Sequence, residues 1–164
     1  MSRVPSGWVI IGDLVRRFRA GPALVSYTVE TDEGWRTRRA RVGETLRGRR
    51  TSVEAEMRGS RWHVNGRRAE RLDGCADIDL GASPVTNTLP INRVRLDVGS
   101  RIDLTAAWVR FPRLSVEPLR QSYERVGERL YVYRSESGFE SEIEVDESGV
   151  VTRYGEFWQA FPDG

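Results

Sequence analysis

The sequence contains no lysine, although 26 of its 164 residues are basic, because every one of those basic residues is arginine. The absence of lysine excludes Schiff-base chemistry, pyridoxal phosphate attachment and a Walker-type phosphate loop. Only one histidine, His63, and one cysteine, Cys75, are present. They exclude a zinc site of the usual Cys/His type built within the chain, and they exclude an intrachain disulfide.

Long hydrophobic runs are also missing. No segment approaches the roughly 20 apolar residues that span a bilayer. Residues 1–19 hold one short apolar run, Trp8 to Ile11, and they lack the basic start and long apolar stretch of a secretory signal. We therefore expect a cytoplasmic protein without a transmembrane segment, in which the single thiol stays reduced.

Charge of one sign is not in large excess. The 26 arginines face 24 acidic residues, and the net charge is +2. This balance does not predict a nucleic-acid partner. The hydrophobic share of 38% includes 15 aromatic residues and argues against disorder. The length predicts a single domain over residues 1–164.

Alternation with a period of two residues recurs along the chain and predicts an all-β fold with mostly antiparallel strands. We expect strands at 24–30, 50–58, 94–98, 102–108, 130–133 and 143–145. Turn signals separate them at intervals typical of a barrel or a sandwich, and Asn65-Gly66 is the strongest hairpin signal. Helix is expected only as short turns, at Leu14 to Phe18 and at Phe157 to Phe161.

Two blocks of charge stand out, an arginine-dense segment at 35–50 and an acidic segment at 136–147. The arginines could form a strip that binds phosphate. The alternative is a solvated strand face that pairs in space with acidic neighbours, and the alternation of the arginines favours this second interpretation.

Few residues are candidates for catalysis. His63 lies in a short strand pattern between Trp62 and Val64, which favours a solvent-facing histidine over a catalytic base. Cys75 has acidic neighbours that would raise its pKa, so we expect a small buried cysteine. Asp77 and Asp79 alternate with apolar residues and are expected to share one exposed strand face.

Two segments carry apolar groups beside a few polar groups, as a small-molecule or lipid pocket requires. In residues 82–92, two prolines six residues apart argue against both a helix and a central strand between them. In residues 106–112, Trp108 and Phe111 flank Arg110. The alternative is a rigid loop followed by a core strand, and composition alone favours neither.

These segments resemble a bacterial family named for glycolipid binding, formerly a domain of unknown function. The resemblance covers nearly the whole chain. It is carried by Leu72-Asp73-Gly74-Cys75, Asp77-Ile78-Asp79-Leu80, Pro84, Thr86-Asn87-Thr88-Leu89-Pro90-Ile91, Ala107-Trp108-Val109-Arg110-Phe111-Pro112, Leu114, Val116-Glu117-Pro118-Leu119, Gln121 and Tyr123. Asn92 stands where the family is expected to have a basic residue.

The resemblance implies a strongly curved antiparallel sheet or an incomplete β-barrel, similar to the bacterial lipoprotein carriers whose concave face holds acyl chains. It implies no catalytic residues and no cofactor.

The first functional hypothesis is therefore non-enzymatic binding of a glycolipid or similar amphiphile on the concave side of the sheet. The expected ligand-binding residues are Trp108, Arg110, Phe111, Thr86, Asn87, Leu89, Ile91 and Trp62. Arg110 could pair bidentately with a phosphate or carboxylate headgroup.

Two other hypotheses remain. The second is a protein-interaction or structural module with a packed core, whose arginine-rich surface binds an acidic partner. The third is an enzyme that uses paired carboxylates such as Asp73 and Asp77, and it requires the two acids to converge in one pocket.

Overall fold

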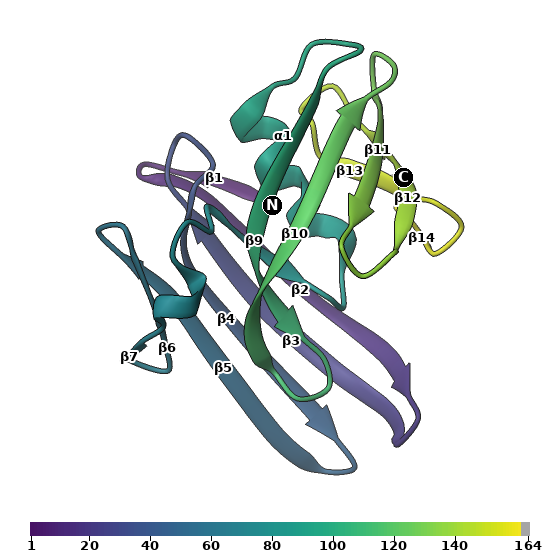
Figure 1. The fold of residues 1–164 in the computed structure, drawn as a ribbon. Coiled ribbons are helices and arrows are strands. Elements are labelled where there is room, and N and C mark those ends of the chain that lie inside the picture. Colours follow the sequence, from purple (N-terminus) through teal and green to yellow (C-terminus); the bar gives the residue numbers. More distant parts are fainter. Residues whose placement is uncertain (162–164) are drawn as a thin grey trace.

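The computed structural model describes residues 1–161, so the last three residues of the predicted domain, 162–164, lie outside the described residues. Two seven-stranded sheets cross each other, and one of them curls into a half-barrel (Figure 1). The predicted all-β, mostly antiparallel fold is confirmed. No helix of the described part is long and apolar enough to cross a membrane.

The first sheet is an antiparallel meander in which each strand pairs with the next along the chain. Its strands are β1 (Ser2–Val4), β2 (Gly7–Phe18), β3 (Gly21–Thr31), β4 (Thr37–Leu46), β5 (Arg49–Arg58), β6 (Arg61–Val64) and β7 (Arg67–Arg68). The predicted turn at Asn65-Gly66 joins the last two strands, and both residues have a positive φ, 49° and 77°. This conformation is the one that a two-residue hairpin requires.

The second sheet has the order β14-β13-β12-β11-β10-β9-β8. Its strands are β8 (Asp77–Leu80), β9 (Arg101–Arg110), β10 (Ser115–Arg125), β11 (Leu130–Ser135), β12 (Glu140–Val145), β13 (Val151–Tyr154) and β14 (Trp158–Gln159). The edge strand β8 runs parallel to β9, and the other pairs are antiparallel. Three short helices precede or follow β8: η1 (Glu70–Leu72), η2 (Pro84–Asn87) and α1 (Thr88–Val94).

Strands β9 and β10 contribute to two hydrophobic cores through opposite faces. Ala107 and Val109 of β9 pack into a first core against the first sheet. Ile102 and Leu104, on the other face of the same strand, pack into a second core beside α1. Because successive side chains of a strand point to opposite faces, one long ribbon covers different partners at its two ends.

A buried ion pair fixes α1 to the second sheet. Arg93, near the end of α1, donates from Nε to Asp77 Oδ1 at 3.1 Å and from Nη2 to Asp77 Oδ2 at 2.6 Å. Burial raises the pKa of Asp77, and the hydrogen bonds and positive charge of Arg93 oppose that rise. The prediction that Asp77 lies on an exposed face is wrong, because the helix covers this end of β8.

Four local predictions are also wrong. Leu14 to Phe18 continue β2, where pairing with β3 satisfies the backbone. Phe157 to Phe161 form a turn and the short strand β14. The expected strand at 94–98 is absent, because α1 runs to Val94.

The fourth wrong prediction is that the two prolines exclude a helix between them. Residues 84–94 are helical, with Pro84 opening η2 and Pro90 at the third position of α1. The first four backbone N–H groups of a helix have no partner within it, so proline in the first turn removes no hydrogen bond.

We expect Arg93→Met to lower the free energy of unfolding by about 3–5 kcal/mol, because it leaves the buried Asp77 carboxylate without a counter-charge. Arg101→Met is the matched control, since Arg101 forms an exposed pair with Asp103 at 2.9 Å and should cost less than about 1 kcal/mol. Urea unfolding measures both values. Equal losses in the two variants would contradict a fixing role for the Asp77–Arg93 pair.

Candidate functional site

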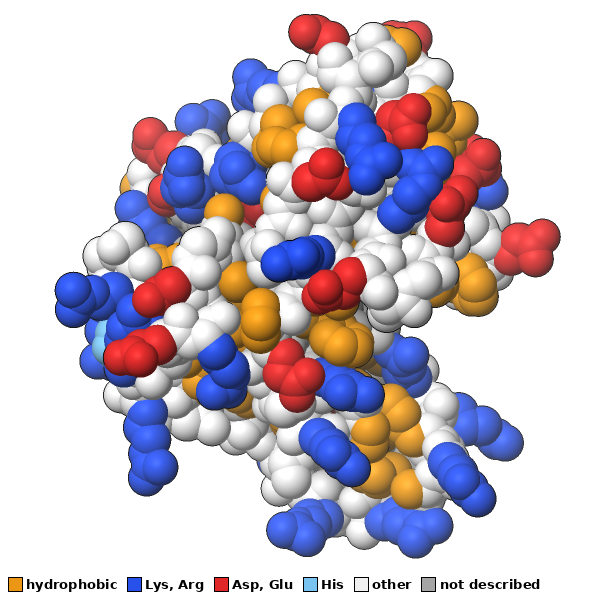
Figure 2. All heavy atoms as spheres, viewed as in Figure 1, with side chains coloured by type: hydrophobic (Ala, Val, Ile, Leu, Met, Phe, Trp, Pro, Cys, Tyr) orange, Lys and Arg blue, Asp and Glu red, His pale blue; other side chains and the backbone are white. Residues whose placement is uncertain are grey.

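A cleft of about 690 Å³ opens between β2 of the first sheet and the concave face of the second sheet. Figure 2 shows the surface hollowed on the right side, between the two sheets. The lining residues are Leu14, Val15, Arg16, Asp79, Leu80, Gly81, Ala82, Ser83, Pro84, Asn87, Trp108, Leu119, Tyr133, Ser135, Ser137, Phe139, Tyr154, Phe157 and Trp158. The cleft thus combines apolar, aromatic and hydroxyl-bearing walls.

Trp108 forms one wall of the cleft and depends on a glycine beside it. A Cβ atom at Gly81 would lie 2.6 Å from Trp108 Nε1 and 3.1 Å from the carbonyl oxygen of Val109. Only glycine therefore lets the indole lie against this backbone segment. Trp108 of β9 pairs with Glu117 of β10, and Leu119 lies two residues further along β10. Because residues two apart on a strand share a face, Trp108 and Leu119 line the cleft from the same face of these two strands.

Aromatic rings form the opposite wall. The ring centroids of Phe139 and Tyr154 are 5.8 Å apart in a stacked arrangement, and those of Phe139 and Phe157 are 5.7 Å apart. Tyr133 lies 6.1 Å from Tyr154. These four residues come from β11, β13 and two turns, so the wall forms only when the second sheet is complete.

A chain of hydrogen bonds runs beneath the cleft. Gln121 Nε2 donates to Asp79, and the Tyr123 hydroxyl donates to Asn87 Oδ1 at 2.6 Å and lies 3.3 Å from Gln121 Oε1. Asn87 Nδ2 donates to the carbonyl oxygen of Pro84 at 2.9 Å. These contacts fix the orientation of two polar groups that face the cleft, the Asp79 carboxylate and the Asn87 amide.

Asp79 is a half-buried carboxyl group, and in the described residues it forms no ion pair. Burial raises its pKa to about 6, against the opposing effect of the Gln121 hydrogen bond. The nearby hydroxyl of Tyr123 also has a raised pKa, because it is buried and because Asp79 and other groups around it are negative or acidic. A carboxylate with one donor partner keeps lone pairs available for hydroxyl groups of a ligand.

The structure brings two of the predicted site residues, Trp108 and Asn87, to the cleft wall. Arg110 is exposed nearby. Its guanidinium carbon lies 5.5 Å from the Trp108 ring centroid, and its Nη1 lies 3.7 Å from Glu117 Oε2. This position is at the rim, where the arginine covers one edge of the indole.

The other predicted site residues lie elsewhere. Thr86 is buried, and its hydroxyl accepts a hydrogen bond from the Leu80 amide at 3.1 Å. Leu89 and Trp62 belong to the first core, Ile91 to the second, and Phe111 packs against the first. None of these side chains lines the cleft, and all but the half-buried Phe111 lie in the interior of the protein.

The remaining chemical candidates are separated. Asp73 pairs with Arg68 at 2.6 Å, whereas Asp77 pairs with Arg93, so the two carboxylates belong to different ion pairs. Cys75 is buried as predicted, and burial together with Asp73 and Asp77 raises its pKa to about 11.

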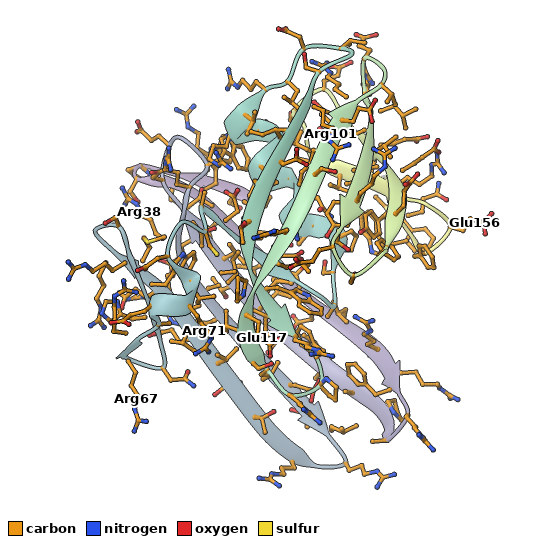
Figure 3. All side chains as sticks on the ribbon, viewed as in Figure 1. Arg38, Arg67, Arg71, Arg101, Glu117 and Glu156 are labelled. Carbon is orange, nitrogen blue, oxygen red and sulfur yellow. The ribbon has the colours of Figure 1, made fainter. Side chains whose placement is uncertain are left out.

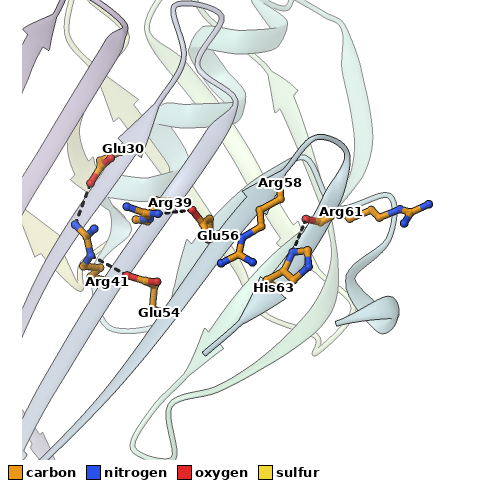
Figure 4. Close-up of polar contacts among 8 residues, drawn as sticks. All are labelled: Glu30, Arg39, Arg41, Glu54, Glu56, Arg58, Arg61 and His63. Atoms are coloured by element: carbon orange, nitrogen blue, oxygen red, sulfur yellow. Dashed lines mark hydrogen bonds and ion pairs between the residues drawn. The ribbon is translucent and has the colours of Figure 1, made fainter. Parts of the chain in front are cut away.

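His63 is half-buried on β6, with its Nδ1 3.2 Å from the Arg61 carbonyl oxygen (Figure 4). Within residues 1–161, no group of three or more His, Cys, Asp and Glu side chains is placed to hold a metal ion.

Asp79, Tyr133, Phe139 and Tyr154 also line the cleft, although they are not among the predicted site residues. The prediction that Asp79 lies on an exposed face is wrong, because the helices and β9 enclose that face of β8. No local pattern indicates that Asp79 and the tyrosines share a cleft, because the order of the strands in the second sheet brings them together.

A family model and a solved structure indicate the same family for this chain. The model of the family described as "Putative glycolipid-binding" matches residues 1–160. No curated protein matches the chain. The crystal structure of a DUF1089 family protein from Pseudomonas aeruginosa, solved at 1.80 Å resolution, is similar to this chain with a TM-score of 0.85 and 29% identity.

The match to that crystal structure covers 98% of this chain and 96% of the other. It confirms the resemblance that the motifs around Asp73, Asn87 and Trp108 indicated. The chain belongs to the family described as "Putative glycolipid-binding", formerly known as DUF1089.

Proposed function

We propose that this protein binds a glycolipid or a similar amphiphile in the cleft, without catalysing a reaction on it. The observation that carries the proposal is the make-up of the cleft, in which an apolar wall and an aromatic wall meet above an oriented carboxylate and amide. Pockets for small molecules typically have apolar walls and a few placed polar groups. The family description supports the same class of ligand.

Each part of an amphiphile has a counterpart in the cleft. Leu14, Leu80, Trp108 and Leu119 offer aliphatic and aromatic surface to an alkyl chain. Asp79 offers acceptors to hydroxyl groups beside the internally bonded Asn87 amide, and the Tyr154 ring offers an apolar face to the C–H groups of a sugar. A volume of about 690 Å³ is in the range of small-molecule sites.

The alternative of a packed interaction module predicts a concave face filled by side chains. Both cores are packed, yet a cleft remains open between β2 and the second sheet. The enzyme hypothesis needs converging carboxylates, and the separate pairing of Asp73 and Asp77 gives it no support.

A cytoplasmic location stays a prediction from the sequence.

Octyl glucoside below its critical micelle concentration is a suitable probe, because it joins a sugar to a short alkyl chain. We expect calorimetry to detect binding, with much weaker binding of octanol or glucose alone, since each lacks half of the contacts. Ser137→Trp, which places an indole at the exposed rim of the cleft, should weaken binding at least tenfold.

Ser148→Trp is the matched control, because Ser148 is an exposed turn residue that does not line this cleft. It should bind octyl glucoside like the unmodified protein. Absence of binding to the unmodified protein, or equal effects of the two substitutions, would contradict the proposal.

Binding should depend on pH through Asp79, whose pKa is about 6. Above that value the carboxylate accepts hydrogen bonds from sugar hydroxyls, and below it the proton removes acceptor capacity. We expect affinity for octyl glucoside to fall about tenfold from pH 7.5 to pH 5, and we expect Asp79→Asn to abolish this dependence. A pH profile identical in both proteins would exclude Asp79 as the responsive group.

The same carboxyl group should make stability depend on pH. The unfolded chain releases this proton near pH 4 and the folded protein holds it until about pH 6, so burial of Asp79 costs stability as pH rises between these values. The free energy of unfolding of the unmodified protein should fall, relative to Asp79→Asn, by up to about 3 kcal/mol from pH 4 to pH 7. Parallel stability curves for the two proteins would show that Asp79 is not desolvated.

A further inference from the structure

One end of the molecule carries a dense group of exposed arginines. They lie on three segments, 14–24, 45–52 and 110–116, which contain no acidic residue. We call this group the arginine tip, and its members are Arg16, Arg17, Arg19, Arg47, Arg49, Arg50, Arg110 and Arg113. The remainder of the chain has 18 arginines against 24 acidic residues, so the charge of the protein is strongly polarised.

The arginine tip differs in its charge from the other end of β3, β4 and β5, where arginines pair with acidic residues. Arg41 pairs with Glu54 at 2.9 Å and with Glu30 at 3.1 Å, and Arg39 pairs with Glu56 (Figure 4). This part of the 35–50 segment confirms the predicted solvated face with acidic partners. Within residues 1–161, no arginine of the tip other than Arg110 forms an ion pair.

The three segments converge in space. Arg47 Nε donates to the carbonyl oxygen of Ala20 at 2.6 Å, which joins the β4–β5 turn to the β2–β3 turn. Phe18 stacks on Phe111 with their centroids 6.5 Å apart, which adds the β9–β10 turn. The turns lie together at the lower end of the molecule, where arginines surround apolar side chains (Figures 1 and 2).

Apolar side chains are exposed among these arginines. Val15 is 74% exposed and Leu24 is 51% exposed. They are cross-strand partners on the outer face of the first sheet, and Phe18 and Phe111 are half-buried on the inner face. Cations around exposed aliphatic and aromatic groups are typical of proteins that bind at the interface of a membrane.

We propose that the arginine tip docks on the surface of an anionic lipid bilayer. Its positive charge complements the lipid phosphates, and the acidic excess elsewhere orients the protein with the tip toward the membrane. Val15 and Leu24 favour a bilayer over a nucleic acid, because aliphatic side chains have an apolar layer to enter there. Arg16 belongs both to the tip and to the cleft lining, so the cleft opens beside the docked surface.

The docking surface goes beyond the proposed function, because it consists of the exposed arginines of three turns, and only Arg16 and its neighbour Val15 also line the cleft. The test is sedimentation with vesicles of phosphatidylcholine containing 30% phosphatidylglycerol, compared with vesicles of pure phosphatidylcholine. We expect binding only to the anionic vesicles, weakening as salt rises. The triple variant R17E/R49E/R50E should weaken it at least tenfold.

The matched control is R38E/R61E/R67E, which changes the net charge equally at exposed arginines outside the tip. Arg38 and Arg67 lie on the left of the molecule, away from the turn that joins β2 to β3 in the tip at the lower right (Figure 3). The control should retain most of the binding, and circular dichroism and thermal unfolding check that both variants fold. Equal losses in the two variants would overturn the proposal, because net charge alone would then explain the binding.

Two further outcomes separate the possible partners and the two proposals. Tighter binding to a short DNA duplex or to polyglutamate than to anionic vesicles, lost in the same tip variant, would overturn a membrane partner. The rim variant Ser137→Trp should sediment with vesicles like the unmodified protein, while the tip variant should bind soluble octyl glucoside normally. Loss of vesicle binding in Ser137→Trp alone would overturn docking by the tip and leave capture of lipid by the cleft.

Discussion

The fold depends on the two faces of one β-ribbon, β9 and β10, being buried against different partners. The face that carries Val109 and Val116 covers the first sheet, and the face that carries Ile102 and Tyr123 covers the second core. Neither face is covered along its whole length. At the end where the second face leaves its core, the half-buried Trp108 and the buried Leu119 line the cleft, so the cleft follows from the ribbon being longer than either core.

Much of the fold could be predicted from local pattern, because alternation and turn chemistry are properties of a few neighbouring residues. The segment 50–58 and the Asn65-Gly66 hairpin form as expected. The predicted exposure of Asp77 and Asp79 is wrong, because alternation shows that two residues share a face of a strand but not whether a helix covers that face. The prediction that Pro90 excludes a helix is wrong for a related reason. The effect of a proline depends on its position within the helix, and the first turn tolerates it.

The candidate site was predictable only in part. Trp108 and Asn87 stand in segments whose composition indicated a pocket, whereas Asp79, Tyr133 and Tyr154 reach the cleft through strand order in the second sheet. Trp62 and Leu89 were also predicted to bind the ligand, but tertiary packing places them in the first core. The cleft and the arginine tip lie side by side: within residues 1–161, Asp79 in the cleft forms no ion pair, and Arg110 alone of the tip arginines forms one.

The central claim is that the cleft holds an amphiphile with its polar group at Asp79. A crystal structure of the protein with dodecyl maltoside tests this claim most directly. We expect electron density for a sugar within hydrogen-bond distance of Asp79, with the alkyl chain along Trp108 and Leu14. Detergent bound only outside the cleft, or a cleft closed by its own side chains, would contradict it.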